Sequence, residues 1–209
     1  MIAGVLLAAG SARRFDGSQK LLAPVPHEGG SVPLVRLASL GLVEAGVDRI
    51  VVVTGHDASK VRDALAGLDV RFVLNAGYAA GMSGSLRAGV EEVKRQWPDT
   101  ASLLIALGDQ PLLGSGIIEE LTKRFGVETE RASQVKIVAP KFRGEAGTPV
   151  LFSTELVPEL LRITGDRGAR SVVDRDATRV AYVDFDRPAP PDVDSAADLA
   201  AFQAELRYR

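Results

Sequence analysis

The sequence predicts an α/β protein whose sheet is mainly parallel and is covered by helices on both faces. Short runs rich in Val, Ile and Leu alternate along the chain with segments of helical periodicity. These runs are apolar almost throughout, rather than at every second position, which is typical of strands buried on both faces of a parallel sheet. Alternation of strands and helices in this way implies right-handed crossovers, with helices packed on both sides.

The first half of the chain carries the clearest elements. Glycine or proline follows each helical segment, at Gly46, Gly67 and Pro98, and marks where the helix ends. We expect strands at 4–8, 49–54, 70–74 and 102–107, and helices at 33–45, 58–66 and 83–95.

The second half is less regular. No repeat, low-complexity tract or interdomain linker divides the chain, so residues 1–209 are expected to form a single domain. The Pro-rich stretch 187–191 has no helical option and is interpreted as a connector, and Ser195 is expected to cap the last helix. The predicted helices are 114–125, 154–163, 168–173 and 196–206, and the predicted strands are 135–140, 149–152 and 179–185.

Composition narrows the classes of function. The chain has 209 residues, of which 46% are hydrophobic and 25% charged, and it has no Cys and two His. Disulfide frameworks, Cys-ligated zinc, thiol nucleophiles and His-rich metal sites are thereby excluded. A formal net charge of −2 argues against a nucleic-acid-coating protein. No apolar run approaches the roughly 20 residues of a membrane span, and the start lacks the basic residues of a signal peptide, so we expect a cytoplasmic protein.

A loop of small residues follows the first predicted strand and leads to basic side chains. Gly10 and its small neighbours let backbone N–H groups approach an anion closely. Arg13, Arg14 and Lys20 add positive charge that backbone dipoles cannot supply. The natural ligand is a polyphosphate, although the loop has neither the Gly-Lys-Ser ending of a Walker A motif nor the three glycines of the dinucleotide fingerprint. The alternative is a tight strand–helix turn with solvated arginines.

Two acidic segments are candidate metal ligands. Asp109 stands where the apolar strand 102–107 ends, and ligands of open α/β sheets bind outside the carboxyl ends of the strands. A carboxylate there is well placed to hold Mg²⁺ against phosphate oxygens. Asp192 and Asp194 precede the last helix and offer a second carboxylate for the same ion. The alternatives are that Asp109 only starts a turn and that the later pair only caps the helix.

Two further loops have weaker signals. Residues 75–86 follow the third predicted strand and open a helix, and their glycines and serines suit either a capped turn or a polar wall that recognises a base or ribose. Residues 165–170 form a charged loop that either reaches substrate phosphate or is a solvated turn.

Together these segments resemble the nucleotidyltransferase-like family that includes the molybdenum cofactor cytidylyltransferases and guanylyltransferases. The resemblance spans essentially the whole chain. Ala9 is similar to the CTP users, because guanylyltransferases typically carry Gly there. Two features depart from the family: Thr148 stands where many members have His, and the loop 15–19 is slightly longer. The matching motifs are Leu7-Ala8-Ala9-Gly10, Arg13-Arg14, Lys20, Gly81 to Leu86, Leu107 to Pro111, Gly147 to Phe152, Gly165 to Arg170 and Asp192-Val193-Asp194.

The resemblance implies a Rossmann-like three-layer sandwich of the nucleotide-diphospho-sugar transferase type. It also implies transfer of CMP from CTP to the phosphate of molybdopterin, with Mg²⁺ as cofactor and a molybdenum hydroxylase apoenzyme as recipient of the product. Asp109 and Asp194 would hold the metal, and Arg14, Lys20 and Asp109 would be catalytic. The nucleotide would lie against Leu7, Ala8, Ala9, Gly10, Ser11, Arg14, Lys20, Asn75, Ser83 and Ser85.

Two other functions stay open on the same fold. One is a flavin- or NAD(P)H-dependent reductase, for which paired metal carboxylates at Asp109 and Asp194 would have no use. The other is a non-catalytic nucleotide-binding accessory protein of a molybdenum hydroxylase.

Overall fold

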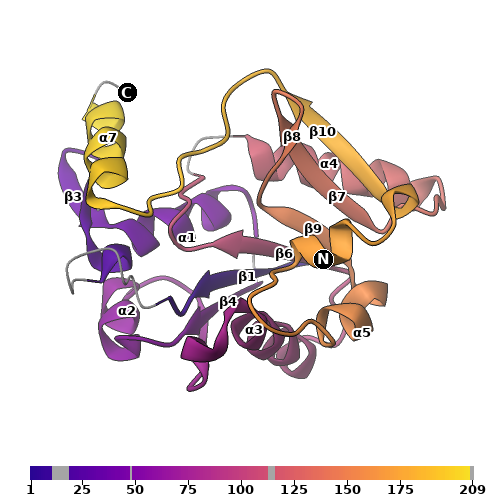
Figure 1. Cartoon of the computed structure of the whole chain (residues 1–209), viewed down its shortest axis with the longest axis horizontal. Coiled ribbons are helices and arrows are strands. Elements are labelled where there is room, and N and C mark those ends of the chain that lie inside the picture. The colour runs from indigo at the N-terminus through magenta and orange to yellow at the C-terminus, as the bar shows by residue number, and fades with distance from the viewer. Residues whose placement is uncertain (11–18, 48, 113–115, 208–209) are drawn as a thin grey trace.

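The computed structural model describes residues 1–10, 19–47, 49–112 and 116–207 (Figure 1). Seven strands lie side by side in the order β10-β7-β9-β6-β1-β4-β5, and β8 pairs with β7 at the margin of the same sheet. Their bounds are β1 Ile2–Ala8, β4 Arg49–Thr54, β5 Arg71–Leu74, β6 Ser102–Leu107, β7 Ile137–Phe142, β8 Glu145–Ala146, β9 Val150–Ser153 and β10 Val180–Phe185.

The half of the sheet built from β5, β4, β1 and β6 is wholly parallel, as predicted. Leu7 of β1 is in register with Val53 of β4 and with Leu107 of β6, so these strands end together. Side chains of β1 alternate between the two faces: Val5 joins one core cluster and Leu6 the other. Burial on both faces is the reason why these strands appear as continuous apolar runs in the sequence.

The other half of the sheet is mixed. β9 runs antiparallel to both β6 and β7, while β10 is parallel to β7. Phe152 of β9 is fully buried, with Leu103 of β6 and Ile137 of β7 as its register partners. The sheet is therefore mostly parallel, with β9 and the short β8 reversed, and the prediction of an α/β fold is confirmed.

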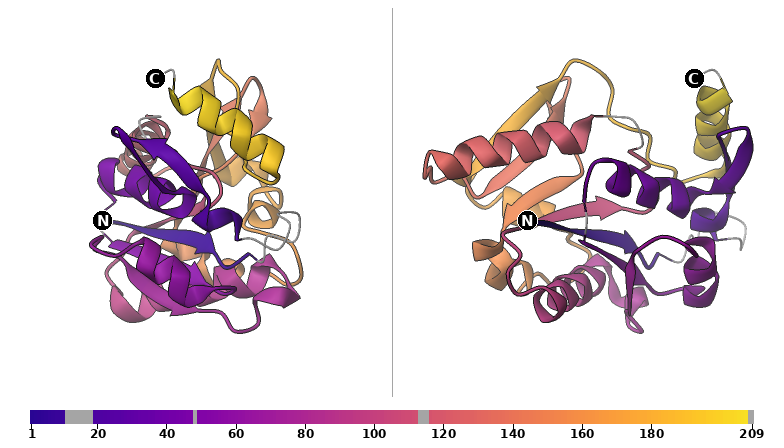
Figure 2. Two further views of the ribbon diagram at one scale, coloured as in Figure 1. Left: turned by 90° about the vertical axis from the view of Figure 1, so that its left-hand side faces the viewer. Right: turned by 180° about the vertical axis from the view of Figure 1, so that it is seen from behind.

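Helices cover both faces and give the three layers (Figure 2). Buried apolar residues of α3, α5 and α6 belong to one core cluster, and those of α2 and α4, with one side of α1, belong to the cluster on the opposite face. None of the helices in the described ranges has the length and hydropathy that a membrane span needs. Their bounds are α1 Leu34–Glu44, α2 Ala58–Ala64, α3 Met82–Gln96, α4 Ile117–Glu130, α5 Val157–Leu160 and α6 Arg170–Val173.

Several elements differ from the sequence prediction. The hairpin of β2 (Pro24–His27) and β3 (Gly30–Pro33) was not expected, because its prolines remove backbone donors and are typical of loops. Its turn residues Glu28 and Gly29 both have positive φ, at 46° and 77°, which suits a tight hairpin. The helix predicted at 33–45 begins after this hairpin, at Leu34.

Three helix boundaries in the second half were also wrong. α4 continues through Gly126 to Glu130 despite the weak helix propensity of glycine. Beyond the glycine, the buried Glu128 accepts a hydrogen bond of 2.7 Å from Ser133 Oγ and pairs with Arg124 one turn earlier, which supports this end of the helix. The helix predicted at 154–163 is a 3₁₀ turn at Thr154–Leu156 followed by α5, and the one predicted at 168–173 is only the short α6.

After β10 the chain crosses back over the molecule to α7 (Ala196–Arg207), which lies beside the β2–β3 hairpin (Figures 1 and 2). We call the connecting residues 186–195 the strap. A third core cluster joins the strap to α7, α1 and β2, with Val193 fully buried at its centre. Gln203 Nε2 of α7 donates a hydrogen bond of 2.7 Å to the Pro24 carbonyl.

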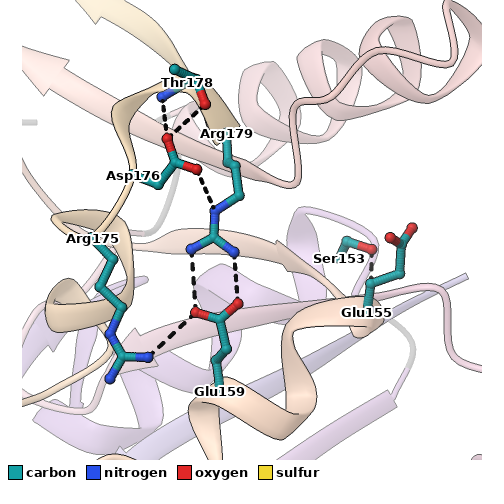
Figure 3. Close-up of polar contacts among 7 residues, drawn as sticks. All are labelled: Ser153, Glu155, Glu159, Arg175, Asp176, Thr178 and Arg179. Atoms are coloured by element: carbon teal, nitrogen blue, oxygen red, sulfur yellow. Dashed lines mark hydrogen bonds and ion pairs between the residues drawn. The ribbon is translucent and has the colours of Figure 1, made fainter.

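A group of charged side chains connects α5 with the segment just before β10, the outermost strand at one side of the sheet (Figure 3). Glu159 of α5 accepts two hydrogen bonds from the guanidinium of Arg179, at 2.6 and 3.2 Å, just before β10 begins. Arg175 adds a third contact to the same carboxylate, at 3.4 Å. These hydrogen bonds, and the positive charges of the two arginines, hold the pKa of Glu159 below its ordinary value.

Candidate active site

The carboxyl ends of the parallel strands form one edge at which backbone bonds tie the loops together. The Gly108 N–H, following β6, donates to the Leu7 carbonyl at 2.9 Å, and the His56 N–H, following β4, donates to the Ala9 carbonyl at 3.4 Å. Ala9 itself is buried. The predicted nucleotide loop therefore begins in the middle of this edge. Ser11 and Arg14 of that prediction lie outside the described residues.

Gln19 connects the end of this loop to its beginning and to the loop after β4, a role that the sequence analysis did not predict. Its side chain is buried, and Nε2 donates to the carbonyls of Gly10 at 3.0 Å and His56 at 3.3 Å. Because Gln19 immediately precedes Lys20, these bonds hold the chain where the lysine side chain must start. A glutamine next to a predicted phosphate-binding lysine was the one available signal.

Lys20 lies between two of the predicted metal ligands. Its ammonium Nζ is 2.7 Å from Asp109 Oδ2 and 2.7 Å from Asp194 Oδ1, and its side chain is only 11% exposed. Burial by itself would lower the pKa of Lys20, but the charges and hydrogen bonds of the two aspartates outweigh it and raise the pKa. The three residues predicted from distant parts of the sequence are thus brought into direct contact.

Asp192 completes an acidic cluster with Asp109 and Asp194. One carboxylate oxygen from each of the three lies within 4.8 Å of the others. Partial desolvation, and then the negative charges of Asp109 and Asp194, raise the pKa of Asp192 to about 6. We call these three aspartates the acidic cluster. Among the residues that the structure describes, they are the one group of three or more potential metal ligands.

Backbone contacts place the strap against the loop after β6. The Val193 N–H donates to the Asp109 carbonyl at 3.1 Å, so the two acidic segments are linked directly. The cap of α7 is made by other groups: Ser195 Oγ accepts from the Asp198 N–H, and the Asp198 carboxylate accepts from the Ser195 N–H. The predicted Ser195 cap is therefore confirmed, and the Asp194 carboxylate bonds to Lys20 instead.

The donor set of the cluster suits a hard divalent cation. Carboxylate oxygens are the ligands that Mg²⁺ and Mn²⁺ prefer, and Mg²⁺ is usually held by one or two of them together with substrate phosphates. Three carboxylates around a single ammonium also carry an excess of negative charge, which a divalent ion would neutralise. The residues present therefore fit such an ion.

The serine-rich loop lies along the same strand edge. Asn75 follows β5, and its N–H donates to the Thr54 carbonyl at 2.8 Å. Asn75 Nδ2 donates to Ser85 Oγ at 3.0 Å, so these two predicted base-pocket residues bond to each other. Ser83 and Ser85 are both buried, at 5% exposure, within the first turns of α3.

The loop at 165–170 packs against the start of α3. The Ser83 N–H donates to the Gly165 carbonyl at 3.2 Å, and the Met82 N–H donates to Asp166 Oδ1 at 3.4 Å. Gly81 has φ +118°, and a Cβ there would lie 2.8 Å from the Gly165 oxygen, so only glycine fits. This charged loop is thus tied to the serine-rich loop and to the start of α3.

Two cavities lie beside this contact. One has a volume of about 310 Å³ and a mainly apolar lining that includes Leu7, Leu107, Thr148 and Val173. The other, of about 860 Å³, is lined by the charged loop, by Arg170 of α6, and by Arg162 and Arg175, which follow α5 and α6. Arg170 lines both cavities, so an apolar pocket next to the strand ends adjoins a basic one.

A mostly parallel sheet that gathers a lysine and a carboxylate cluster at its strand ends defines a protein of the nucleotidyltransferase class of folds. Residues 4–180 match the family model of the MobA-like NTP transferase domain, and the chain belongs to this family. A nucleotidyl transferase from Methanothermobacter thermautotroptrophicus shares the fold, with a TM-score of 0.80 at 24% identity over 100% of this chain and 99% of that one. The predicted fold type is thereby confirmed.

Relatives of the chain have different names. The nicotine blue oxidoreductase of Paenarthrobacter nicotinovorans is 29% identical over 95% of this chain and 94% of its own length. A probable molybdenum cofactor guanylyltransferase of Haloferax mediterranei is 32% identical over 58% of this chain and 54% of its own length. The bifunctional protein GlmU of Geotalea uraniireducens is 31% identical over 59% of this chain, which spans only 26% of that relative.

Among solved structures, Rv0371c from Mycobacterium tuberculosis H37Rv is similar over nearly its full length. It has a TM-score of 0.76 and 27% identity, with 97% of this chain and 98% of that one covered. The same protein in complex with manganese also matches, with a TM-score of 0.72 at 27% identity and the same coverage. These similarities agree with membership of the chain in the MobA-like NTP transferase family.

Proposed function

We propose that this protein is a Mg²⁺-dependent nucleotidyltransferase that transfers CMP from CTP to the phosphate of molybdopterin and releases pyrophosphate. The observation that carries the proposal is the contact of Lys20 with Asp109 and Asp194 at the strand ends. The ammonium of Lys20 supplies a positive charge for the phosphates, and the carboxylates supply negative charge for the metal ion that accompanies a triphosphate. The manganese complex of the Rv0371c relative and the guanylyltransferase relative support the metal and the acceptor class.

In this reaction an oxygen of the acceptor phosphate attacks the α-phosphorus of CTP. A new P–O bond forms, the bond from the α-phosphorus to the bridging oxygen breaks, and pyrophosphate takes the electron pair. The acceptor brings its own nucleophile, so catalysis is chiefly positioning and electrostatic stabilisation. When bound, the divalent ion would neutralise charge on the phosphate oxygens, held by Asp109 and Asp194, with Asp192 as a third carboxylate.

The chain's own groups have separate tasks. Lys20 would stabilise negative charge on the leaving pyrophosphate, and Arg14 would have the same task. Backbone groups from Leu7 to Ser11 would seat the nucleotide, and Ala9 with Asn75, Ser83 and Ser85 would face the base and ribose. The apolar cavity beside Leu107 is the proposed place of the acceptor ring system, with Arg170 at its basic end.

The proposal is tested by pyrophosphate release from purified protein supplied with molybdopterin, Mg²⁺ and either CTP or GTP. We expect release with CTP that stops when the metal is chelated. Thermal shifts with each triphosphate give the base preference independently, since a ligand at 100 times its Kd adds about 2.7 kcal/mol. Equal or larger shifts with GTP would refute the CTP assignment, and Ala9→Gly should relax the preference.

A reductase is the second candidate, because the nicotine blue oxidoreductase matches almost the full length of this chain. A flavin- or NAD(P)H-dependent enzyme would be yellow or would oxidise NAD(P)H without releasing pyrophosphate. A nucleotide-binding accessory protein of a molybdenum hydroxylase would show thermal shifts with CTP but no turnover. The three outcomes are therefore distinct, and the acidic cluster favours the transferase, since hydride transfer needs no paired metal carboxylates.

A further inference from the structure

A buried glutamine connects the acidic cluster with the apolar cavity. Gln110 follows Asp109 directly and is only 7% exposed. Its Nε2 donates to the Pro190 carbonyl of the strap at 3.3 Å. Its Oε1 accepts a hydrogen bond from Thr148 Oγ1, and Thr148 lines the apolar cavity. One side chain therefore bonds to two segments that are far from it in sequence.

The position of Pro190 makes the first bond important for the cluster. Pro190 lies two residues before Asp192 and four before Asp194. Further along the strap, the Val193 N–H bonds to the carbonyl of Asp109 at 3.1 Å. The side chain of Gln110 and the backbone of Asp109 thus hold the strap at two points that flank Asp192. Without the first point, the approach of Asp192 would depend on the Val193 bond, on the ion pair of Asp194 with Lys20 and on packing.

The two hydrogen-bonding partners of residue 110 require a side-chain amide at that position. A side chain here must donate to a carbonyl at one end and accept from a hydroxyl at the other, and the Gln amide carries a donor and an acceptor in one rigid plane. An ionised Glu could accept from Thr148 but would place an acceptor against the Pro190 oxygen. Met has the shape but neither function, and a buried polar group that loses its partner costs free energy.

We propose that Gln110 is a positioning residue that sets the strap, and with it Asp192 and Asp194, for metal binding, and that Thr148 acts through it. Thr148 holds the amide plane in the orientation that presents Nε2 to Pro190. The proposal deepens the proposed function and rests on its metal site. Since Thr148 lines the apolar cavity, the same glutamine also connects the wall of that cavity to the strap.

The test is Gln110→Met, measured by titration of Mn²⁺ alone into the full-length protein and by hydrogen exchange of the Val193 amide. We expect Mn²⁺ affinity to fall about tenfold or more, as for other groups that orient metal ligands, and exchange at Val193 to quicken. Gln96→Met is the matched control, because Gln96 Nε2 also makes one hydrogen bond of 2.9 Å, to Glu92 on α3. It should leave both readouts unchanged.

Thr148→Val is a second test, because it removes the hydroxyl that donates to Gln110 and keeps the shape of the side chain. It should weaken Mn²⁺ binding by less than Gln110→Met does, and the double variant should bind no worse than Gln110→Met. A Mn²⁺ Kd of Gln110→Met within twofold of the unmodified protein, or multiplicative effects in the double variant, would overturn the proposal. If the unmodified protein binds no Mn²⁺, the proposed metal site fails, and exchange at Val193 alone decides whether Gln110 holds the strap.

Discussion

Asp194→Asn separates a metal ligand from a helix cap. Asn caps a helix about as well as Asp, and in this structure Ser195 and Asp198 make the cap in any case. The substitution leaves the shape of the side chain and removes one negative charge from the acidic cluster. A structural role for Asp194 therefore predicts almost no effect, whereas the metal role predicts a loss of affinity with the fold intact.

The size of both effects follows from the geometry. The three cluster oxygens lie within 4.8 Å of one another, so an ion bound among them would be no farther than that from the Asp194 oxygen. At this upper limit, Coulomb's law in bulk water gives about 1.7 kcal/mol between a divalent cation and one carboxylate. This corresponds to about a 20-fold loss of affinity, a lower bound that suits a side chain that is 51% exposed. The ion pair with Lys20 is worth at most about 1 kcal/mol of stability at such exposure, or about 2 °C in Tm for a chain of this length.

The assay is titration of Mn²⁺ without nucleotide, followed by thermal unfolding of the same samples. Asp69→Asn is the matched control, since Asp69 is exposed and precedes β5, at the opposite end of the strands from the acidic cluster. Asp109→Asn should lose affinity to a similar degree. An affinity of Asp194→Asn within threefold of the unmodified protein would refute the assignment of Asp194 as a ligand.

Three further outcomes are expected. Lys20→Ala should lower turnover at saturating CTP more than it weakens CTP binding, because charge on pyrophosphate is greatest in the transition state; wild-type turnover would remove Lys20 from the reacting phosphates. Glu159→Gln should cost about 1 kcal/mol at pH 7 in denaturant unfolding. Since the pKa of Glu159 is lowered by folding, this stabilisation is present above its ordinary value of 4.5 and is lost as the pH falls through the lowered pKa of the folded state. A cost that does not shrink as the pH is lowered from 7 into the acid range would contradict the ion-pair explanation. Gly81→Ala should destabilise by about 1–3 kcal/mol through its positive φ, whereas Gly126→Ala on α4, with open space around it, should not, and equal Tm values for the two variants would count against the strain.

The parallel half of the fold was predictable because its signals are local. Strands such as 102–107 are buried on both faces, and their continuous apolar sequence reports that burial directly. The hairpin at residues 24–33 was not predictable in this way, since its strands are short, rich in proline and stabilised by packing against α1 and α7. The extension of α4 through Gly126 was not predictable for a related reason, because it depends on the contacts of Glu128 with Arg124 and Ser133, which the helical periodicity does not report.

For the candidate site, the types and order of the residues were predictable, and their bonding was not. Asp109 was recognisable because a carboxylate at the end of an apolar strand has no role in the core. The contact of Lys20 with Asp194 depends on the path of the strap across the molecule, which no local pattern encodes. The bonds of Gln19 and Gln110 were not predictable, because the position of a glutamine in the sequence does not show which carbonyl or hydroxyl groups its amide will meet.

The strap also gives the acidic cluster a place in the order of folding. Lys20 and Asp194 are 174 positions apart, so their contact closes a loop that includes most of the chain. Entropy makes such long closures favourable only after the intervening segments have become compact. The sheet can therefore assemble before the strap returns to it, so the proposed affinity for a divalent ion would arise only in the last stage. In a time-resolved refolding experiment, Mn²⁺ binding would consequently report completion of the native topology, later than any signal from the core.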